Sequence, residues 1–186
     1  MENFTVATAE SCTGGLLASR LTDFAGASNY VKGGVVAYTN EIKKSVLRVN
    51  AETLENFGAV SSQTALEMAK NVREIFKSTF GLSTTGVAGP STSEGKAVGT
   101  VFVAIAGENF SEVKEFYFKG SRSEIKFQAA DEAFKILMEH TMEDEFNEES
   151  KSAMREARLI SEKKIPAKSF NNVEELLEDL NSDADD

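Results

Sequence analysis

The chain has 186 residues and a net charge of −10, and 41% of its residues are hydrophobic. One cysteine and one histidine can build neither an internal disulfide nor a Cys/His zinc site, so we expect no structural metal. No apolar run approaches the ~20 residues that span a bilayer, and the acidic surplus argues against nucleic acid as a partner. The N-terminus lacks a basic segment followed by an apolar one, so we expect a cytoplasmic protein.

The charge is unevenly spread along the chain. Residues 1–142 carry 14 basic and 16 acidic side chains, whereas residues 143–186 carry 6 basic and 14 acidic ones. The second segment also has too little apolar surface to fold alone. We therefore expect a folded domain over residues 1–142 and an acidic tail over residues 143–186 that is partly helical or disordered.

The chain begins with two predicted strand-to-helix junctions. Residues 4–9 are rich in strand formers, and after a Ser/Thr/Gly turn apolar residues recur at helical spacing from Leu16 onward. Residues 34–39 form a second strand-like run, and Asn40 directly after it suits the start of a helix.

The second half of the domain starts with a long predicted helix. Ser61 or Ser62 can cap it, and its apolar residues form one stripe as far as Phe76. The following segments are, in chain order, a short strand over residues 82–85, hairpin strands over 98–106 and 113–118, and a closing helix over 121–140.

This order of elements predicts the fold class. Strands that alternate with helices and are followed by a hairpin and a helix are typical of an α/β protein, here a three-layer α/β/α sandwich with a mixed sheet. Ligands of such sheets bind outside the carboxyl ends of the strands. Polar loops around Ser11, over residues 38–43 and over residues 85–90 each follow a predicted strand, so we expect them to converge on one site.

Ser11 lies in the first strand-to-helix turn, just before Thr13, Gly14 and Gly15. The start of a helix offers unpaired N–H groups to an oxyanion or a phosphate, so a hydroxyl there could be a nucleophile. A plain helix cap is an equally ordinary role for Ser11 or Thr13, and the two roles can coexist.

A serine nucleophile needs a base, and the single histidine is badly placed for that role. His140 falls at the far end of the last predicted helix, away from the strand ends. Lys43 starts close to a strand end and could act as base if burial lowers its pKa. The alternative is a solvated lysine, which is what we expect of its neighbour Lys44.

Three further side chains near these loops each have two interpretations. Cys12 could itself be the nucleophile, or a small buried hydrophobic residue. Tyr38 could donate a hydrogen bond to substrate or to Ser11, or simply pack at a strand end. Thr85, before the glycine-containing loop, has the same ambiguity.

The loop over residues 86–90 and the start of the last helix are candidate anion contacts. Gly86 and Gly89 could bring backbone N–H groups against a ligand phosphate, although Gly and Pro also mark ordinary turns. Arg122 opposes the dipole at the start of its helix and so could hold an anion, with a solvated arginine as the alternative.

Five motifs in order resemble the CinA C-terminal family of nicotinamide-nucleotide amidohydrolases. They are Ala9-Glu10-Ser11-Cys12-Thr13-Gly14-Gly15, Tyr38-Thr39-Asn40-Glu41-Ile42-Lys43, Gly58-Ala59-Val60-Ser61, Thr85-Gly86-Val87-Ala88-Gly89-Pro90 and Lys96-Ala97-Val98-Gly99-Thr100-Val101. The resemblance covers nearly all of residues 4–140. It implies hydrolysis of nicotinamide mononucleotide to nicotinate mononucleotide and ammonia, without a metal or cofactor.

The resemblance also implies roles for the residues singled out above. Ser11 becomes the nucleophile, Lys43 its base, Tyr38 and Thr85 polar partners, and Arg122 the phosphate contact. Our mechanistic hypothesis is that N–H groups of Thr13, Gly14 and Gly15 hold the oxyanion while Ser11 attacks the carboxamide.

Two features depart from the family pattern within the domain. Family members usually have a helix before the first strand, where this sequence has three residues, so we expect a partly uncovered sheet face that a second subunit of a homo-oligomer could cover. Lys126 stands where an arginine is frequent, which predicts a weaker bidentate grip on phosphate.

The acidic tail departs from the family altogether. Residues 153–157 and 168–180 resemble the C-terminal half of RelB/DinJ-type antitoxins, which implies a RelE-type toxin as a partner. A disordered acidic tail explains the composition equally well.

The sequence therefore leaves two other function classes open. A non-catalytic nucleotide-binding module would keep the loop at Gly86 and Arg122 but have no use for Ser11 with Lys43. A toxin-binding interaction protein would use the tail and keep the domain as a scaffold.

Overall fold

A mixed five-stranded sheet is the middle layer of residues 4–142, the part of the chain that this computed structural model describes. The strands are β1 (Val6–Glu10), β2 (Val31–Val36), β3 (Phe80–Gly86), β4 (Thr100–Ala106) and β5 (Ser111–Tyr117). They lie in the order β2-β1-β3-β4-β5. β1 pairs in parallel with β2 and β3, whereas β4 pairs antiparallel with β3 and β5.

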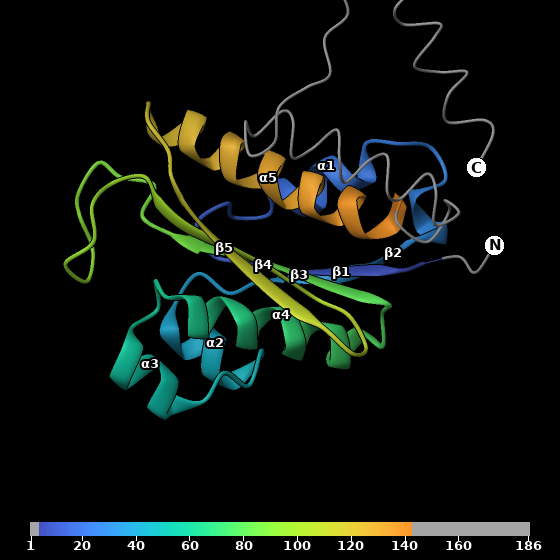
Figure 1. The fold of residues 1–186 in the computed structure, drawn as a ribbon, viewed down its shortest axis with the longest axis horizontal. Coiled ribbons are helices and arrows are strands. Elements are labelled where there is room, and N and C mark those ends of the chain that lie inside the picture. The colour runs from blue at the N-terminus through green and yellow to red at the C-terminus, as the bar shows by residue number, and fades with distance from the viewer. Residues whose placement is uncertain (1–3, 143–186) are drawn as a thin grey trace, which may run out of the picture. The chain divides into compact units, whose positions relative to one another are not determined.

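Helices cover both faces of this sheet (Figure 1). Helices α1 (Leu16–Thr22) and α5 (Arg122–Met142) lie on one face, and α2 (Asn40–Ser45), α3 (Ala51–Phe57) and α4 (Ser62–Phe76) lie on the other. This arrangement confirms the predicted three-layer α/β/α sandwich with a mixed sheet.

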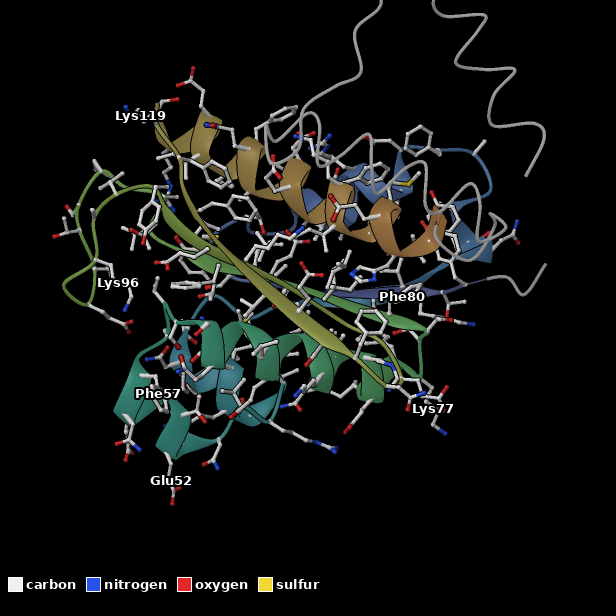
Figure 2. All side chains as sticks on the ribbon, in the orientation of Figure 1. Glu52, Phe57, Lys77, Phe80, Lys96 and Lys119 are labelled. Carbon is white, nitrogen blue, oxygen red and sulfur yellow. The ribbon has the colours of Figure 1, made fainter. Side chains whose placement is uncertain are left out.

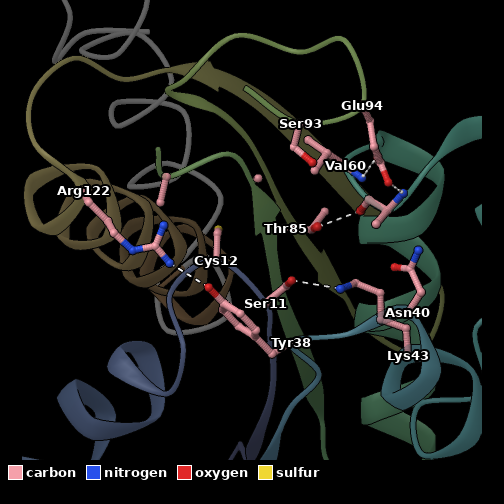
Figure 3. A pocket seen from close by; sticks show the side chains of 13 residues that line it. Ser11, Cys12, Tyr38, Asn40, Lys43, Val60, Thr85, Ser93, Glu94 and Arg122 are labelled. Atoms are coloured by element: carbon pink, nitrogen blue, oxygen red, sulfur yellow. Dashed lines mark hydrogen bonds between the residues drawn. The ribbon is translucent and has the colours of Figure 1, made fainter. Parts of the chain in front are cut away.

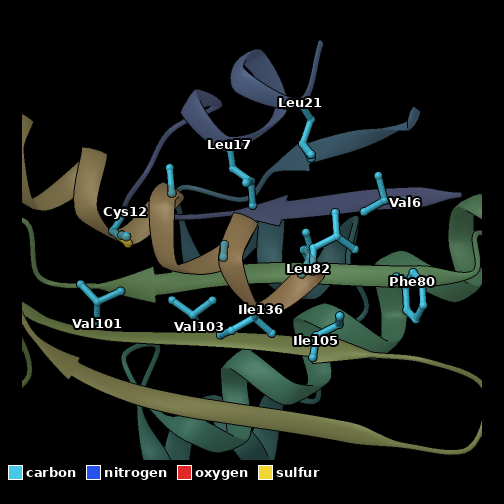
Figure 4. Packing of buried hydrophobic residues seen from close by; sticks show 14 of the residues in the cluster. Val6, Cys12, Leu17, Leu21, Phe80, Leu82, Val101, Val103, Ile105 and Ile136 are labelled. Atoms are coloured by element: carbon cyan, nitrogen blue, oxygen red, sulfur yellow. The ribbon is translucent and has the colours of Figure 1, made fainter. Parts of the chain in front are cut away.

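Each face of the sheet has its own hydrophobic core. The cluster on the α1 and α5 face includes Val6, Leu17, Leu82 and Ile136 (Figure 4). The cluster between β1 and α4 includes Ala7, Ala9, Met68 and Val72. All five residues of β1 are buried, so packing on both faces fixes the strand and the start of the turn that follows it.

Small residues let α4 approach β3 closely. A Cβ added at Gly81 would lie 2.1 Å from the carbonyl oxygen of Ala69, so only glycine fits there. Two residues on, the Ser83 hydroxyl donates to the carbonyl oxygen of Ala65 at 2.6 Å. These contacts fix the end of β3 relative to the helical layer.

The labelled side chains of Figure 2 mark the two ends of the sheet. Lys96 and Phe57 lie at the end where β1 and β3 finish, and Lys77 and Phe80 lie at the opposite end. Long loops gather at the first end, where the sequence predicts a site.

Among the strands and α-helices, β2 and α3 differ most from the sequence prediction. Strand β2 begins at Val31 rather than at residue 34 and ends before Ala37. It is an edge strand whose residues alternate between half-buried and exposed, so no continuous apolar run marks its ends in the sequence. Helix α3 was not predicted; Asn50 caps it by accepting a hydrogen bond from the Glu52 N–H at 3.0 Å. The edge strand also leaves Val36 50% exposed.

Two kinds of feature are absent from residues 4–142. No helix in this range is long and apolar enough to cross a membrane. Within the same range, His, Cys, Asp and Glu side chains form no group of three or more that could hold a metal ion. The antitoxin-like tail of residues 143–186 lies outside the described residues.

Candidate active site

A cavity of about 330 Å³ opens at the carboxyl ends of β1 and β3. Ser11 follows β1 directly, Thr85 lies near the end of β3, and Tyr38 comes two residues after β2. Lys43 and Arg122 reach the same cavity from α2 and α5 (Figure 3). The fold thus brings together five residues that are up to 111 positions apart in the printed sequence.

The Lys43 amine contacts the Ser11 hydroxyl directly. Its Nζ donates to Ser11 Oγ at 2.9 Å and to the carbonyl oxygen of Ala37 at 2.9 Å (Figure 3 shows the first contact). The Lys43 side chain points into the protein and only 1% of the residue is exposed, whereas Lys44 beside it is exposed. Lys43 is therefore a buried lysine rather than a solvated one.

Burial lowers the pKa of Lys43 from its ordinary value, because the interior solvates an ammonium group poorly. The negative charge of Glu94 acts in the opposite direction and favours the ammonium form. A lowered pKa increases the fraction of neutral amine near pH 7. A neutral amine has a lone pair and can accept the proton of Ser11 Oγ.

The turn after Ser11 is arranged differently from the sequence-based hypothesis. The Thr13 hydroxyl and the Gly15 N–H both donate to Glu10 Oε2, at 2.6 Å and 2.9 Å. Thr13 is fully buried, and neither it nor Gly14 nor Gly15 is among the residues that line the cavity. We therefore correct the assignment of these three residues as oxyanion or substrate contacts, because none of them lines the cavity and the Glu10 carboxylate already binds Thr13 and Gly15.

Tyr38 and Arg122 form the opposite wall of the cavity. Arg122 Nη2 donates to the Tyr38 hydroxyl at 2.7 Å, and Nη1 donates to the carbonyl oxygen of Gly89. Tyr38 is 58% exposed, so its ring does not pack in the core, which was the alternative interpretation. The pair fixes a guanidinium group at the rim of the cavity, where an anion can reach it.

Thr85 and Gly86 shape the wall beside Ser11. The Thr85 hydroxyl donates to the carbonyl oxygen of Ala59 at 2.7 Å and so ties β3 to the turn before α4. A Cβ at Gly86 would lie 2.7 Å from the carbonyl oxygen of Thr100, so this position accepts only glycine. Gly89, with φ of +83°, is not among the residues that line the cavity, and its carbonyl oxygen accepts the hydrogen bond from Arg122 Nη1.

Asn40, which lies in the predicted loop over residues 38–43, also lines the cavity, as do Ser93 and Glu94, which the sequence did not point to. The Glu94 carboxylate accepts hydrogen bonds from the N–H groups of Ala59 and Val60, both at 3.0 Å (Figure 3). This contact fastens the loop between β3 and β4 to the turn before α4. No local signal could have shown it, because the partners are 35 and 34 residues apart.

The two alternative reactive side chains are not suited to the chemistry. Burial raises the pKa of Cys12 to about 12, so its thiol is protonated near neutral pH. His140 contacts Glu112 Oε2 at 3.0 Å and stacks on Phe110. It lies 18 positions after Arg122 along α5, which is about 27 Å of helix.

Comparisons with known proteins identify relatives of this chain. A profile described as the CinA C-terminal domain matches residues 1–141. The "Putative competence-damage inducible protein" of Desulforamulus reducens is 50% identical over 132 residues, which are 71% of this chain and 32% of that protein. A protein of the same name from Bacillus subtilis is 49% identical over 129 residues, 69% of this chain and 31% of that protein. The chain thus spans about a third of the length of these relatives.

Solved structures share the fold. The competence/damage inducible protein CihA of Agrobacterium tumefaciens is 42% identical and superposes with a TM-score of 0.71, covering 73% of this chain and 84% of that one. A protein of the competence-damaged protein (CinA) superfamily from Escherichia coli is 31% identical with a TM-score of 0.72, covering 74% of this chain and 80% of that one.

Proposed function

Because the chain belongs to the CinA C-terminal domain family, we propose that it is an amidohydrolase that converts nicotinamide mononucleotide to nicotinate mononucleotide and ammonia. The observation that carries the proposal is the 2.9 Å contact between Ser11 Oγ and the buried amine of Lys43. A hydroxyl paired with an amine of lowered pKa supplies the nucleophile and the general base that acyl transfer at neutral pH requires. A module that only binds nucleotides has no use for such a pair.

The first half of the proposed reaction forms an acyl-enzyme. Neutral Lys43 takes the proton of Ser11 Oγ, and that oxygen attacks the carboxamide carbon. Cys12 follows the nucleophile and lines the cavity, and in this scheme its N–H group is the oxyanion donor in place of those of Thr13, Gly14 and Gly15. The ammonium of Lys43 then gives its proton to the leaving nitrogen, the C–N bond breaks, and ammonia departs.

The second half of the reaction restores the enzyme. Lys43, neutral again, takes a proton from a water molecule, whose oxygen attacks the ester formed with Ser11. The ester C–O bond breaks, the proton returns to Ser11 Oγ, and the nicotinate product leaves. Lys43 thus serves as base and then as acid in each half of the reaction.

Substrate specificity in this proposal comes from the cavity rim. Arg122 is held by Tyr38 and Gly89 in a fixed direction, so its guanidinium group can bind a phosphate without much loss of side-chain entropy. We expect the phosphate of the mononucleotide to lie at Arg122 while the carboxamide lies at Ser11.

Replacing Arg122 by glutamine tests this placement. For nicotinamide mononucleotide we expect KM to rise about tenfold, corresponding to ~1.4 kcal/mol, with kcat changed less than about threefold. Nicotinamide riboside lacks the phosphate, so its kcat/KM should be the same with both proteins. Ammonia release from the two substrates measures this, and an equal loss on both would show that Arg122 acts elsewhere.

The lowered pKa of Lys43 predicts how activity depends on pH. Because neutral Lys43 is the base, kcat/KM should rise with pH through the Lys43 pKa, which lies below its ordinary value. Removing the negative charge of Glu94 disfavours the ammonium form further. The variant Glu94→Gln should therefore move the acidic limb of the profile to lower pH.

The pH profile of kcat/KM for nicotinamide mononucleotide checks this prediction. Glu55→Gln is the matched control, since it removes one carboxylate from an exposed position on α3 that does not line the cavity. That control should leave the limb in place. An unmoved limb in Glu94→Gln, or one moved to higher pH, would contradict the role of Lys43 as base.

A further inference from the structure

Glu10, the last residue of β1, is a carboxylate buried in the middle of the protein. Only 1% of the residue is exposed. It does not line the cavity, although it directly precedes Ser11 in the chain. A buried charge of this kind is costly unless every oxygen is hydrogen-bonded, so its partners indicate what it does.

Four donors surround the Glu10 carboxylate, and all belong to the segment just after Ser11. Oε2 accepts from the Thr13 hydroxyl at 2.6 Å, the Gly15 N–H at 2.9 Å and the Leu17 N–H at 3.0 Å. Oε1 accepts from the Ala18 N–H at 2.8 Å. The residue at the N-cap of α1 is Gly15, which has no capping side chain, so Glu10 provides that function from five residues upstream.

This geometry closes the turn that bears Ser11 into a loop. The chain leaves Glu10, passes through Ser11 and returns to the Glu10 carboxylate at Thr13 and Gly15. Thr84 on β3 holds the same loop from the side. Its carbonyl oxygen accepts from the Ser11 N–H at 2.8 Å, and its hydroxyl lies 2.7 Å from the Thr13 hydroxyl.

The backbone of Glu10 also reaches the base. Its carbonyl oxygen accepts a hydrogen bond from the Ala37 N–H at 2.8 Å. The carbonyl oxygen of Ala37 in turn accepts from Lys43 Nζ at 2.9 Å. Glu10 is thus connected to the turn that bears Ser11 through its side chain, and to the Lys43 amine through its main chain and the Ala37 peptide.

We propose that Glu10 is a positioning residue for the pair of Ser11 and Lys43, and that its carboxylate holds the turn so that Ser11 Oγ faces the amine. The inference rests on the proposed amide hydrolysis. It assigns no contact between Glu10 and the substrate. Loss of the carboxylate should therefore slow the chemical step and leave substrate binding nearly unchanged.

The variant Glu10→Gln tests this role. Glutamine has nearly the same size, but its NH₂ group takes the place of a carboxylate oxygen. A donor then faces the donors that this oxygen accepted from, so the turn must shift. For nicotinamide mononucleotide we expect kcat to fall at least about tenfold, with KM within about twofold of wild type. Covalent labelling of Ser11 by a fluorophosphonate should slow by a similar factor.

A second variant keeps the test decisive if Glu10→Gln does not fold. Thr13→Val removes one of the four donors and should lower kcat and the labelling rate about threefold or more. Ser78→Ala is the matched control: it removes a buried hydrogen bond of 2.8 Å to the Phe80 carbonyl oxygen at the other end of the sheet. We expect it to lower Tm without changing kcat or labelling.

The outcomes separate this inference from the proposed function. A folded Glu10→Gln or Thr13→Val protein with a lower Tm but wild-type kcat and labelling rate would reduce Glu10 to a helix cap and overturn the inference. Wild-type protein that releases no ammonia from the mononucleotide but is labelled at Ser11 would refute the proposed substrate only, and the labelling rates would still test Glu10. Absence of labelling in the wild type would refute the inference, since no activated serine would exist to be positioned.

Discussion

Replacing Ser11 by alanine lowers kcat/KM for nicotinamide mononucleotide at least about 10³-fold, because the change removes the only atom that attacks the carboxamide in the proposed reaction. The fold should survive, since the hydroxyl contributes one hydrogen bond, to Lys43, worth ~1 kcal/mol. We expect Tm to change by only a few degrees, about 2 to 8 °C. Ammonia release and thermal unfolding measure the two effects.

The control for this variant is Ser19→Ala, which removes an exposed hydroxyl from α1. It should retain full activity. If Ser11→Ala released ammonia at more than about a tenth of the wild-type rate, water rather than Ser11 would be the nucleophile, and the acyl-enzyme scheme would be wrong.

Replacing Lys43 by methionine should have a comparable effect on activity. Methionine fills nearly the same buried volume but cannot accept a proton, so kcat should fall at least about 10³-fold. The substitution also removes an amine that burial destabilises in its charged form, at the expense of the hydrogen bonds to Ala37 and Ser11. We therefore expect a folded, inactive protein.

Lys44→Met is the matched control for the base, since it makes the same chemical change at the next position of α2, where the side chain is exposed. Activity of that variant should equal wild type. A folded Lys43→Met protein with more than about a tenth of wild-type kcat would mean that another group takes the proton of Ser11.

The fold could be predicted where a segment buries one clear face. Helix α4 was predicted because Ala65, Met68 and Val72 recur on its buried side, and Ser61 caps it as expected by accepting from the Thr64 N–H. Helix α3 was missed because only Thr53 and Leu54 of its seven residues are buried, which is too short a stripe to show a period. The predicted range of edge strand β2 was shifted because none of its residues is fully buried, so its sequence shows no clear apolar face.

The site could be predicted only as far as its polar residues follow strands. Ser11, Tyr38 and Thr85 each come at or just after a strand end. Lys43 and Arg122 were singled out as well, but each kept a solvated side chain as its alternative until the family resemblance implied a role. These five meet at one cavity.

The supporting contacts could not be predicted from the sequence. The donors to the Glu10 carboxylate depend on how the turn after β1 folds back, and an acidic residue at a strand end gives no sign of this. For the same reason the sequence analysis assigned the N–H groups at the start of α1 to an oxyanion, whereas the structure shows the Glu10 carboxylate bound there. The place of Glu94 in the cavity depends on its hydrogen bond from the Ala59 N–H, a contact between residues more than 30 positions apart.

The most direct test of the account is the product balance of the wild-type full chain with nicotinamide mononucleotide. Ammonia is measured by a coupled assay, and the nucleotide products are identified by mass spectrometry. The account predicts one ammonia and one nicotinate mononucleotide for each mononucleotide consumed. Binding of the mononucleotide without turnover, or release of free nicotinamide in place of ammonia, would contradict it.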